Sequence, residues 1–342
     1  MDALTALLNA PRAQGAFLLR VTMSPPWAVR VQDEAPLTVV AVTVGSTCFV
    51  PDQGDSVTLR AGDLLLIARP APYLFADSPT QQPQAVIHPG GRCETPAGAS
   101  LDLPTHHGVR TWGNDPMGRD TLLVGTYPSV GEAGSRVLRA LPPTFVLRAG
   151  DHQPRLVEIL GDELRGDGIG QASLLDRLLD ALVVAVIRHW ASSPEADPPG
   201  WLHAGTDPVV RDALDLMHDQ TAQPWTVASL AQRVGMSRAG FSRRFATAVG
   251  EPPMSYLTSW RLALAADLLR QDDEPVFRVA AEVGYTSPFT FSTAFKRSYG
   301  VSPLFYRQQG SISAWTRSLP TRQAMGDPVA PMDQVANPAV DT

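Results

Sequence analysis

Apolar residues change their spacing near residue 150 of this 342-residue chain. Between about Phe17 and Phe145, apolar and β-branched runs such as LTVVAVTV and DLLLIA alternate with turns rich in Gly, Pro and Asp. This pattern predicts β-strands. Residues 76–120 are dense in Pro, Gly and Asp and predict a long irregular insertion. We therefore expect residues 1–150 to form a β-domain.

From Arg155 on, apolar residues recur at helical spacing, first in RLVEILGDELRG and then in the longer QASLLDRLLDALVVAVIRHWA. The longer segment carries an apolar stripe made of Leu174, Leu175, Leu178, Leu179, Leu182 and Val186. The stripe is wide, and two interpretations stay open. Residues 151–191 either pack on the β-domain or join two copies into a homodimer, with Leu178 and Val186 at the interface.

The rest of the chain divides into a linker, a helical segment and a tail. SSPEADPPG is polar and Pro-rich and predicts a linker over residues 192–206. Residues 207–309 are nearly all helical in pattern, whereas residues 310–342 lack periodicity and predict a disordered tail. The expected fold class is α+β, with an N-terminal β-barrel, a helical extension and an all-α C-terminal domain.

The helical segment contains an internal repeat. LAQRVGMSRAGFSRRFATAVGEPPMSYL is followed by the similar VAAEVGYTSPFTFSTAFKRSYGVSPLFYR. Five positions recur at a constant offset, so that Phe241, Phe245, Gly250, Pro253 and Tyr256 become Phe291, Phe295, Gly300, Pro303 and Tyr306. The segment therefore predicts two copies of one structural unit.

Each copy predicts a helix-turn-helix. A glycine, Gly235 or Gly284, permits the positive φ of the turn. A serine, Ser237 or Ser287, is placed to cap the second helix. The two phenylalanines of each copy are four residues apart and share one helix face, so they anchor that helix on the core. The opposite face is then free to enter the major groove of DNA.

Counting from the phenylalanine pairs identifies the outward positions of the two second helices. We expect these positions to contact bases, and they are Arg238, Ala239, Ser242, Arg243, Phe289, Thr290, Ser292 and Thr293. Arg243 is the natural guanine reader, because a guanidinium bonds O6 and N7 together. Four further basic residues are better placed for phosphates, namely Arg244, Lys296, Arg297 and Arg307.

Charge is distributed unevenly along the chain. Residues 225–309 hold ten basic and six acidic residues, a net charge of +4, although the whole chain has a net charge of −6. A basic segment on an acidic body is expected when one domain meets phosphates and the other does not. A plain helical bundle would not need the two matched copies or the basic outward faces.

The C-terminal part, WTVASLAQRVGMSRAGFSRRFATAVGEPPMSYLTSWRLALAADLLRQ through VSPLFYR, resembles the DNA-binding domain of the AraC/XylS family of transcription regulators. The N-terminal part, through LRAGDLLLIARPAPYLF, resembles the cupin-like effector domain of one AraC-type subfamily, which includes a sensor of reactive chlorine. The resemblance implies binding to double-stranded DNA, RNA polymerase as a partner, a homodimer and control by a small-molecule effector.

The resemblance also implies how the DNA-binding half is divided. The first helix-turn-helix covers about residues 227–249 and the second about residues 276–299. A linking helix, PPMSYLTSWRLALAADLLRQ, is expected to hold the two units apart. Helical spacing predicts that its core-facing residues are Leu257, Trp260, Leu264 and Leu268.

Metal-dependent cupin enzymes hold their metal with a cluster of histidines and a carboxylate on strands. This sequence has Tyr73 where many cupins carry a histidine, and His88, His106 and His107 lie in the insertion instead. We therefore expect no metal, no cofactor and no catalytic residue. An unmetallated barrel offers an apolar effector cavity, with Trp27, Tyr73 and Phe75 as candidate wall residues, although each also fits core packing.

The sequence favours a transcription regulator over two other functional classes. A cupin oxygenase or isomerase fused to a DNA-binding arm needs at least three convergent metal ligands, which the sequence does not supply. A purely architectural DNA protein would not need a separate acidic domain of about 190 residues.

The two cysteines, Cys48 and Cys93, are expected to be ordinary thiols, with a redox-sensing pair as the alternative. The chain has no run of 18 or more apolar residues and no secretory signal pattern. We expect a cytoplasmic protein that does not enter a membrane.

Overall fold

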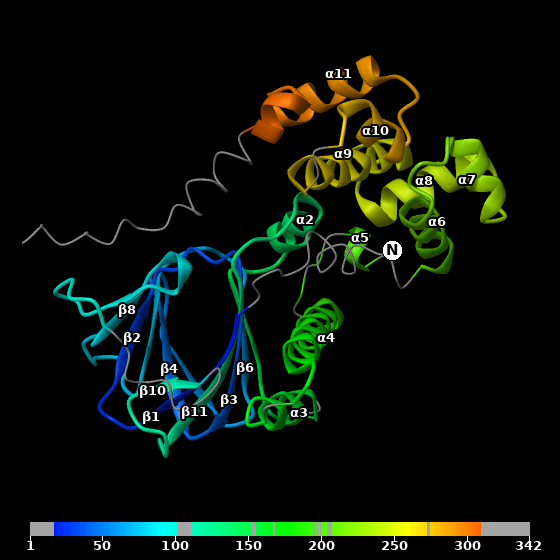
Figure 1. Cartoon of the computed structure of the whole chain (residues 1–342). Helices are drawn as coiled ribbons and strands as arrows, with labels where there is room; N and C mark the ends of the chain where they lie inside the picture. Colours follow the sequence, from blue (N-terminus) through cyan, green and yellow to red (C-terminus); the bar gives the residue numbers. More distant parts are fainter. Residues whose placement is uncertain are drawn as a thin grey trace, which may run out of the picture.

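The structure is a computed structural model. It describes residues 17–101, 111–151, 155–166, 168–193, 196, 198, 200–203, 207–271 and 274–308. Within these residues, a β-structure formed by the first half of the chain lies beside helices that follow it, and a separate group of helices lies above both (Figure 1).

The β-structure consists of two six-stranded sheets. The first sheet has the order β10 (Thr111–Gly113), β1 (Phe17–Met23), β11 (Asp120–Tyr127), β3 (Leu37–Val44), β6 (Leu64–Ile67) and β12 (Thr144–Leu147). The second has the order β5 (Val57–Arg60), β4 (Ser46–Pro51), β7 (Tyr73–Ala76), β2 (Ala28–Val31), β8 (Ala85–Ile87) and β9 (Cys93–Glu94). The pairs β1–β10 and β2–β8 are parallel, and the other pairs are antiparallel.

Strand β3 shows why the first sheet is buried on both faces. Its alternate residues belong to two different cores. Val40 and Val42 join the core between the two sheets, whereas Val39 and Ala41 join the core between the first sheet and the helices. The described strands pair within each sheet and not between the sheets, so the expected closed barrel is observed as two packed sheets.

Helix α2 (Glu132–Ala140) lies between β11 and β12 in the chain, and α3 (Arg155–Glu163) and α4 (Gln171–Ser192) follow the last strand. Helices α3 and α4 lie beside β3 and β6 of the first sheet (Figure 1). Leu179 of α4 packs so close to Gly125 of β11 that a Cβ there would lie 2.3 Å from the leucine Cδ1. Gly125 therefore permits the close approach of helix and sheet.

The packing of α4 on the first sheet shows which residues of the apolar stripe belong to the chain's own core. Leu175, Leu179, Leu182 and Val186 are all buried in the chain's own core, with Val186 only 1% exposed. The expectation that Val186 lies in an interface between two copies is therefore wrong. Leu178 is half-buried against the same core, and Leu174 remains 45% exposed.

The C-terminal helices form two small cores joined by one long helix. The first core contains residues of α6 (Pro208–Asp219), α7 (Val227–Arg233) and α8 (Arg238–Val249). The second contains residues of α10 (Val276–Glu282) and α11 (Pro288–Tyr299). Helix α9 (Pro253–Gln271) contributes to both, and the short α5 (Gly200–His203) precedes them.

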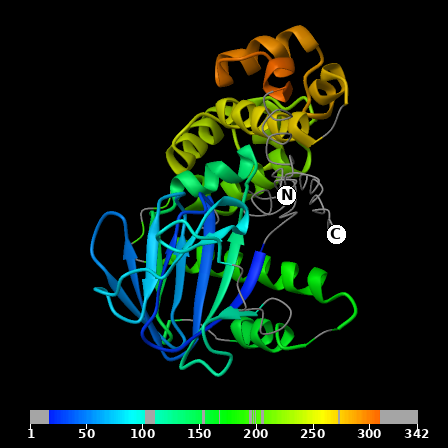
Figure 2. The ribbon, with the colours of Figure 1, turned by 60° about the vertical axis from the view of Figure 1, so that its left-hand side comes forward.

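The structure also corrects two expectations for the first 150 residues. The segment that predicted only strands contains helix α2, which lies between the sheets and α9 (Figures 1 and 2). The region expected to be irregular, residues 76–120, holds the short strands β8, β9 and β10 and the 3-10 turn η1 (Pro89–Gly91). The predicted tail, residues 310–342, lies outside the described residues.

Candidate nucleic-acid interface and sensor cavity

The first helix-turn-helix is built by local signals that the sequence carries. Thr226 caps α7 through a reciprocal pair of hydrogen bonds with Ser229. The turn places Gly235 at φ 68°, and the Ser237 hydroxyl then accepts a hydrogen bond from the Gly240 N–H at 3.2 Å. Phe241 and Phe245 are fully buried. Helix α8 is thus held by one face, and its other face is left outside.

The second unit repeats this construction. Gly284 has φ 84°, and the Ser287 hydroxyl accepts a hydrogen bond from the Thr290 N–H at 3.4 Å. Phe291 and Phe295 are fully buried, and Tyr285 packs edge-on against Phe291. The caps, turns and anchors predicted from the repeat are confirmed.

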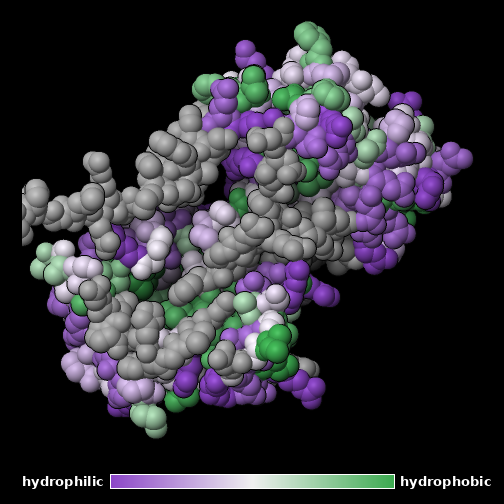
Figure 3. Space-filling view, viewed as in Figure 1, coloured by the Kyte–Doolittle hydropathy of each residue, from purple (hydrophilic) through white to green (hydrophobic). Residues whose placement is uncertain are grey.

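The predicted base-contacting residues lie on the outer sides of α8 and α11. Arg238, Ala239 and Arg243 are exposed on α8, and Ser242 is half-buried. On α11, Thr290 and Thr293 are exposed and Ser292 is half-buried, in the same register. Phe289 is 82% exposed, which is unusual for a large apolar side chain. The surface over α6, α7 and α8 is mostly hydrophilic (Figure 3).

The four predicted phosphate contacts divide into two kinds. Lys296 and Arg297 are exposed on α11. Arg244, in contrast, donates from Nε to the Asp207 carboxylate at 2.7 Å. This hydrogen bond lowers the pKa of the carboxyl, which also caps α6 through the Val209 and Val210 N–H groups.

Arg307 also has a partner within the chain, because its Nη2 donates to the Glu274 carbonyl. Arg244 and Arg307 therefore help to hold loops in place, a role that the sequence did not indicate. Their contacts with phosphates stay predictions.

The two units touch each other as well as the linking helix. Arg261 of α9 donates to the Thr221 carbonyl at 2.9 Å and to the Gln223 carbonyl at 2.6 Å, both in the loop before α7. A Cβ at Gly284 would lie 2.8 Å from the Ala222 backbone. The turn of the second unit therefore packs directly against the first unit. The sequence predicted that the linking helix holds the two units apart, but the structure brings them into contact.

Helix α9 is buried on more sides than a single apolar stripe requires. Leu257 and Trp260 are buried as predicted, but Leu264 and Leu268 are only half-buried. Ala263, Ala265 and Ala266 are buried instead. These small residues let other elements approach α9 closely, and α2 of the N-terminal half is one of them.

Helix α2 begins on a carboxylate that belongs to α9. Asp267 accepts hydrogen bonds from the Glu132 N–H at 2.6 Å and the Ala133 N–H at 3.3 Å. Asp267, on α9 of the C-terminal half, therefore caps the N-terminus of α2, which belongs to the N-terminal half of the chain. Asp267 is 5% exposed, and burial raises the pKa of its carboxyl to about 6.

Side chains of α2 reach both helix-turn-helix units. Glu132 accepts a hydrogen bond from the Tyr306 hydroxyl at 2.9 Å and lies 3.3 Å from the Arg270 guanidinium. Tyr306 belongs to the core of the second unit. One end of α2 thus contacts the core of the second unit.

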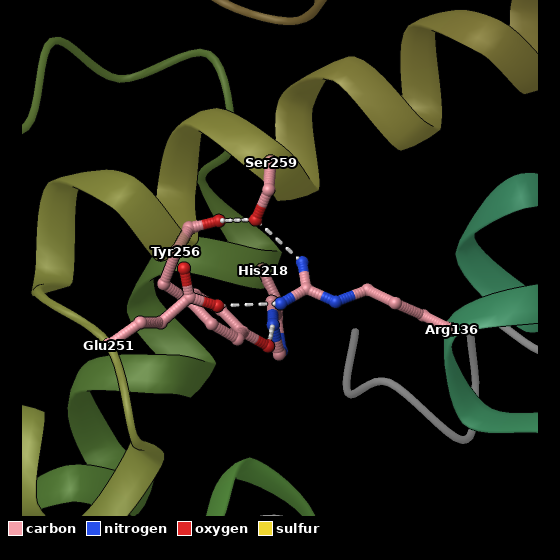
Figure 4. A network of polar contacts seen from close by, with 5 residues as sticks. All are labelled: Arg136, His218, Glu251, Tyr256 and Ser259. Atoms are coloured by element: carbon pink, nitrogen blue, oxygen red, sulfur yellow. Dashed lines mark hydrogen bonds and ion pairs between the residues drawn. The ribbon is translucent and has the colours of Figure 1, made fainter. Parts of the chain in front are cut away.

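The next turn of α2 contacts the first unit. Arg136 donates to the Ser259 hydroxyl at 2.7 Å and to the Glu251 carboxylate at 2.8 Å (Figure 4). Its guanidinium lies 4.9 Å from the centre of the Tyr256 ring. The Tyr256 hydroxyl in turn lies 2.8 Å from His218 Nε2 on α6. We call the contacts of α2 with α9, Glu251 and Tyr306 the α2 contact.

Sequence reasoning missed the α2 contact. The only signal was the short amphipathic segment EAGSRVLRA, in which Ala133, Val137 and Leu138 are buried. Its polar partners lie more than 100 positions further along the chain.

A cavity of about 380 Å³ lies between the two sheets. The three residues predicted to wall an effector cavity, Trp27, Tyr73 and Phe75, all line it. The Trp27 indole N–H is satisfied by Asp120 at 3.0 Å, and Tyr73 and Phe75 pack edge-to-face at 5.5 Å. The volume falls in the range of small-molecule sites.

His88 is the one histidine of the predicted insertion that lies within the described residues. Among the described residues, no group of three or more His, Cys, Asp or Glu side chains is arranged to hold a metal ion. His88 contacts Gln32 and Glu94, whereas His106 and His107 lie outside the described residues. No helix in the described part of the chain is long and apolar enough to cross a membrane.

Cys48 and Cys93 are both buried, and burial raises the pKa of each thiol. They lie on β4 and β9, four strand spacings apart in the second sheet, which is on the order of 15–20 Å along the sheet. A disulfide between them would need a Cα separation below about 7 Å.

Fold and site together define a DNA-binding protein with an attached β-domain that encloses a cavity. Residues 2–192 match a family model described as Cupin, and residues 230–309 match one described as a Helix-turn-helix domain. An AraC-like transcription regulator of Streptomyces lividans is 30% identical over 91% of this chain and 100% of its own length. One of Streptomyces antibioticus is 29% identical over 90% of this chain and 99% of its own.

Among solved structures, the C-terminal domain of AraT, a response regulator from Geobacillus stearothermophilus, is 35% identical. The match covers 30% of this chain and 86% of that domain, with a TM-score of 0.30. The family models and the Streptomyces relatives show that the chain belongs to the AraC family of transcription regulators, with an N-terminal cupin domain.

Proposed function

We propose that this transcription regulator reads duplex DNA with the outer faces of α8 and α11 and responds to a small effector held in the cavity of its cupin domain. The observation that carries the proposal is the pair of recognition helices, each capped by a serine and anchored by two buried phenylalanines. Anchoring from one side leaves the other side to enter a major groove.

The two recognition helices differ in what they offer to bases. Arg243 on α8 is exposed and matches a guanine edge with two hydrogen bonds, whereas Thr293 takes its place on α11. Phe289, exposed at 82%, is suited to contact a thymine methyl. We infer that the first unit contributes most of the sequence preference and the second contributes affinity.

Affinity also needs phosphate contacts. Lys296 and Arg297 are exposed, so they are the first candidates on the second unit. Arg244 already donates to the Asp207 carboxylate and Arg307 to the Glu274 carbonyl. To contact a phosphate, each arginine would have to divide its N–H groups between the two acceptors or break the hydrogen bond within the chain. A phosphate would compete with the Asp207 carboxylate for Arg244, so DNA binding and the start of α6 are linked at this point.

The α2 contact gives the sensor domain a direct route to the DNA-binding domain. One nine-residue helix touches Tyr256 of the first unit and Tyr306 of the second. A shift of α2 relative to the sheets would therefore alter the relation between the two units. Such a shift changes DNA affinity only if the effector binds one arrangement better than the other.

The remaining parts of the proposal rest on the family. The relatives are transcription regulators, and we infer that the cupin domain regulates rather than catalyses. We also propose that the protein works in the cytoplasm, contacts RNA polymerase and acts as a homodimer. The exposed side of α4, where Leu174 lies, remains available to a second copy, whereas the buried side is not.

The direct test is retardation of the DNA upstream of the protein's own gene by the full-length chain, at several salt concentrations. We expect binding that weakens steeply with salt, because each neutralised phosphate releases counterions. A variant with Arg238 and Arg243 both changed to alanine should lose preference for that DNA over unrelated DNA. Equal binding of both DNAs by the natural chain would contradict sequence-specific recognition.

A further inference from the structure

The cavity of the cupin domain has an aromatic and aliphatic wall. Trp27, Tyr73, Phe75 and Trp112 contribute aromatic rings, and the strands β1, β2 and β11 contribute aliphatic residues. Strand alternation keeps the basic side chains of these strands out of the cavity. On β2, for example, Val29 and Val31 line the cavity, while Arg30 pairs with Asp52 outside it.

The charge on this wall is negative. Among the described lining residues, Asp33 is the single carboxylate, and none is Lys, Arg or His. Asp33 follows β2 and is half-buried, and its Oδ1 accepts a hydrogen bond from the Ala35 N–H at 3.1 Å. No ion pair to Asp33 forms within the described part of the chain. Burial raises the pKa of the Asp33 carboxyl. The pKa of the Tyr73 hydroxyl is raised first by burial and then by the negative charge of Asp33.

A half-buried carboxylate without a cation beside it is costly for the protein. In a wholly apolar cavity for neutral ligands, such a group would lower affinity rather than raise it. A ligand that brings its own positive charge removes this cost. The aromatic rings that line the same cavity add to the attraction, because the ring quadrupole attracts cations.

We propose that this cavity binds a hydrophobic small molecule carrying a protonated amine, with the ammonium group against Asp33 and the apolar body among the aromatic rings. This assignment names the ligand class for the effector role proposed above, and it rests on that role for its biological meaning. An anionic ligand such as a fatty acid is disfavoured, because its carboxylate would face Asp33 with no described lining cation to meet it.

A matched series of probes tests the ligand class. The full-length protein is titrated by calorimetry at pH 7 with 4-phenylbutylamine, 4-phenylbutanol and 4-phenylbutyrate, which share one apolar body and differ in the terminal group. We expect the amine to bind roughly tenfold more tightly than the alcohol, and the carboxylate to bind more weakly than both.

Two variants place the effect on Asp33. Asp33→Asn keeps an oxygen that accepts from the Ala35 N–H but removes the charge, so it should bring the amine to within about threefold of the alcohol. Asp55→Asn is the matched control, because Asp55 is exposed and does not line the cavity. It should leave the preference unchanged. Circular dichroism and thermal melting establish that both variants fold.

The proposal is overturned if the carboxylate binds as well as the amine, if the amine and the alcohol bind equally, or if none of the three binds. It is also overturned if folded Asp33→Asn keeps the full preference for the amine. These outcomes are separate from failure of the proposed function, because retardation of DNA by the same preparation is measured without any probe.

Discussion

At the scale of single residues, Asp267 differs most from what its position in the sequence suggests. It lies within a helix of the DNA-binding domain, yet it caps the first turn of a helix in the cupin domain. The hydrogen bonds from the Glu132 and Ala133 N–H groups lower the pKa of the Asp267 carboxyl, the Glu132 side-chain charge raises it, and Arg270 on α9 lowers it again. Burial remains the largest cause.

The raised pKa of Asp267 predicts how stability depends on pH. Its pKa is about 6 in the folded protein and 3.8 ordinarily, so the folded state binds the proton more tightly. The stabilisation from this group is fully present below pH 3.8 and is lost as the pH rises through about 6. Asp267→Asn accepts the same two N–H groups but does not titrate.

The free energy of unfolding of the natural chain, measured relative to the Asp267→Asn variant in urea, should therefore increase as the pH falls from 7.5 to 5. Comparison with the variant cancels the titration of groups elsewhere in the protein. A difference that stays flat would show that Asp267 keeps its ordinary pKa in the folded protein, and one that grows towards pH 7.5 would show that folding lowers this pKa.

Arg243 and Thr293 occupy equivalent positions on the two recognition helices, and they make a second prediction at this scale. Arg243→Ala should relax base preference in one half of the binding site, because a bidentate contact discriminates bases by about 1–3 kcal/mol. Thr293→Ala should change little. Selection from randomised DNA with both variants measures this, and equal shifts in the selected sequences would refute the asymmetry.

At the scale of elements, the two turns look alike in sequence but differ in their surroundings. Gly235 and Gly284 both have positive φ, at 68° and 84°. Around Gly235 a Cβ would meet nothing within 4 Å, whereas at Gly284 it would collide with the Ala222 backbone and the Arg261 guanidinium at 2.8 Å. The two copies of the repeat therefore have the same backbone conformation at the turn but different packing around it.

Gly235→Ala should cost about 1–2 kcal/mol of stability, because only the positive φ is strained. Gly284→Ala should cost about 1–3 kcal/mol more, because the added methyl also forces the two units apart. Chemical denaturation of the full-length variants measures both values. Equal losses would mean that the second unit does not rest on Ala222 in solution.

At the scale of the whole molecule, the sensor and DNA-binding domains meet through polar groups at the α2 contact. Arg136, Glu132 and Asp267 contribute ion pairs and hydrogen bonds, around a small apolar patch of Ala133, Trp260 and Ala263. Polar contacts of this kind open at lower free energy than an apolar core, so this region is suited to a regulated change.

Arg136→Ala should loosen the α2 contact while leaving each domain folded. The arginine joins Glu251, Ser259 and the Tyr256 ring, and losing such charged hydrogen bonds costs about 1.5–3 kcal/mol. Hydrogen exchange should become faster in α2 and in the first turns of α9. Arg139→Ala is the control, because Arg139 is an exposed arginine on the same helix. Unchanged exchange after Arg136→Ala would argue against the contact.

The sequence alone determined the DNA-binding half in considerable detail. The repeat, the serine caps, the turn glycines and the buried phenylalanine pairs were all predicted, and the structure has them. The physical reason is that these features act within about fifteen residues. A cap, a turn and an i, i+4 pair are set by near neighbours, and the second copy supplies an independent check.

Only the tertiary structure decided which residues meet across long distances in the chain. It placed Asp33 and Trp112 in the cavity with the three predicted wall residues, and it packed two separate sheets where a closed barrel was expected. It also joined α2 to partners more than 100 positions away. Such contacts depend on how apolar faces far apart in sequence pack together, and the spacing of residues along one segment does not encode them.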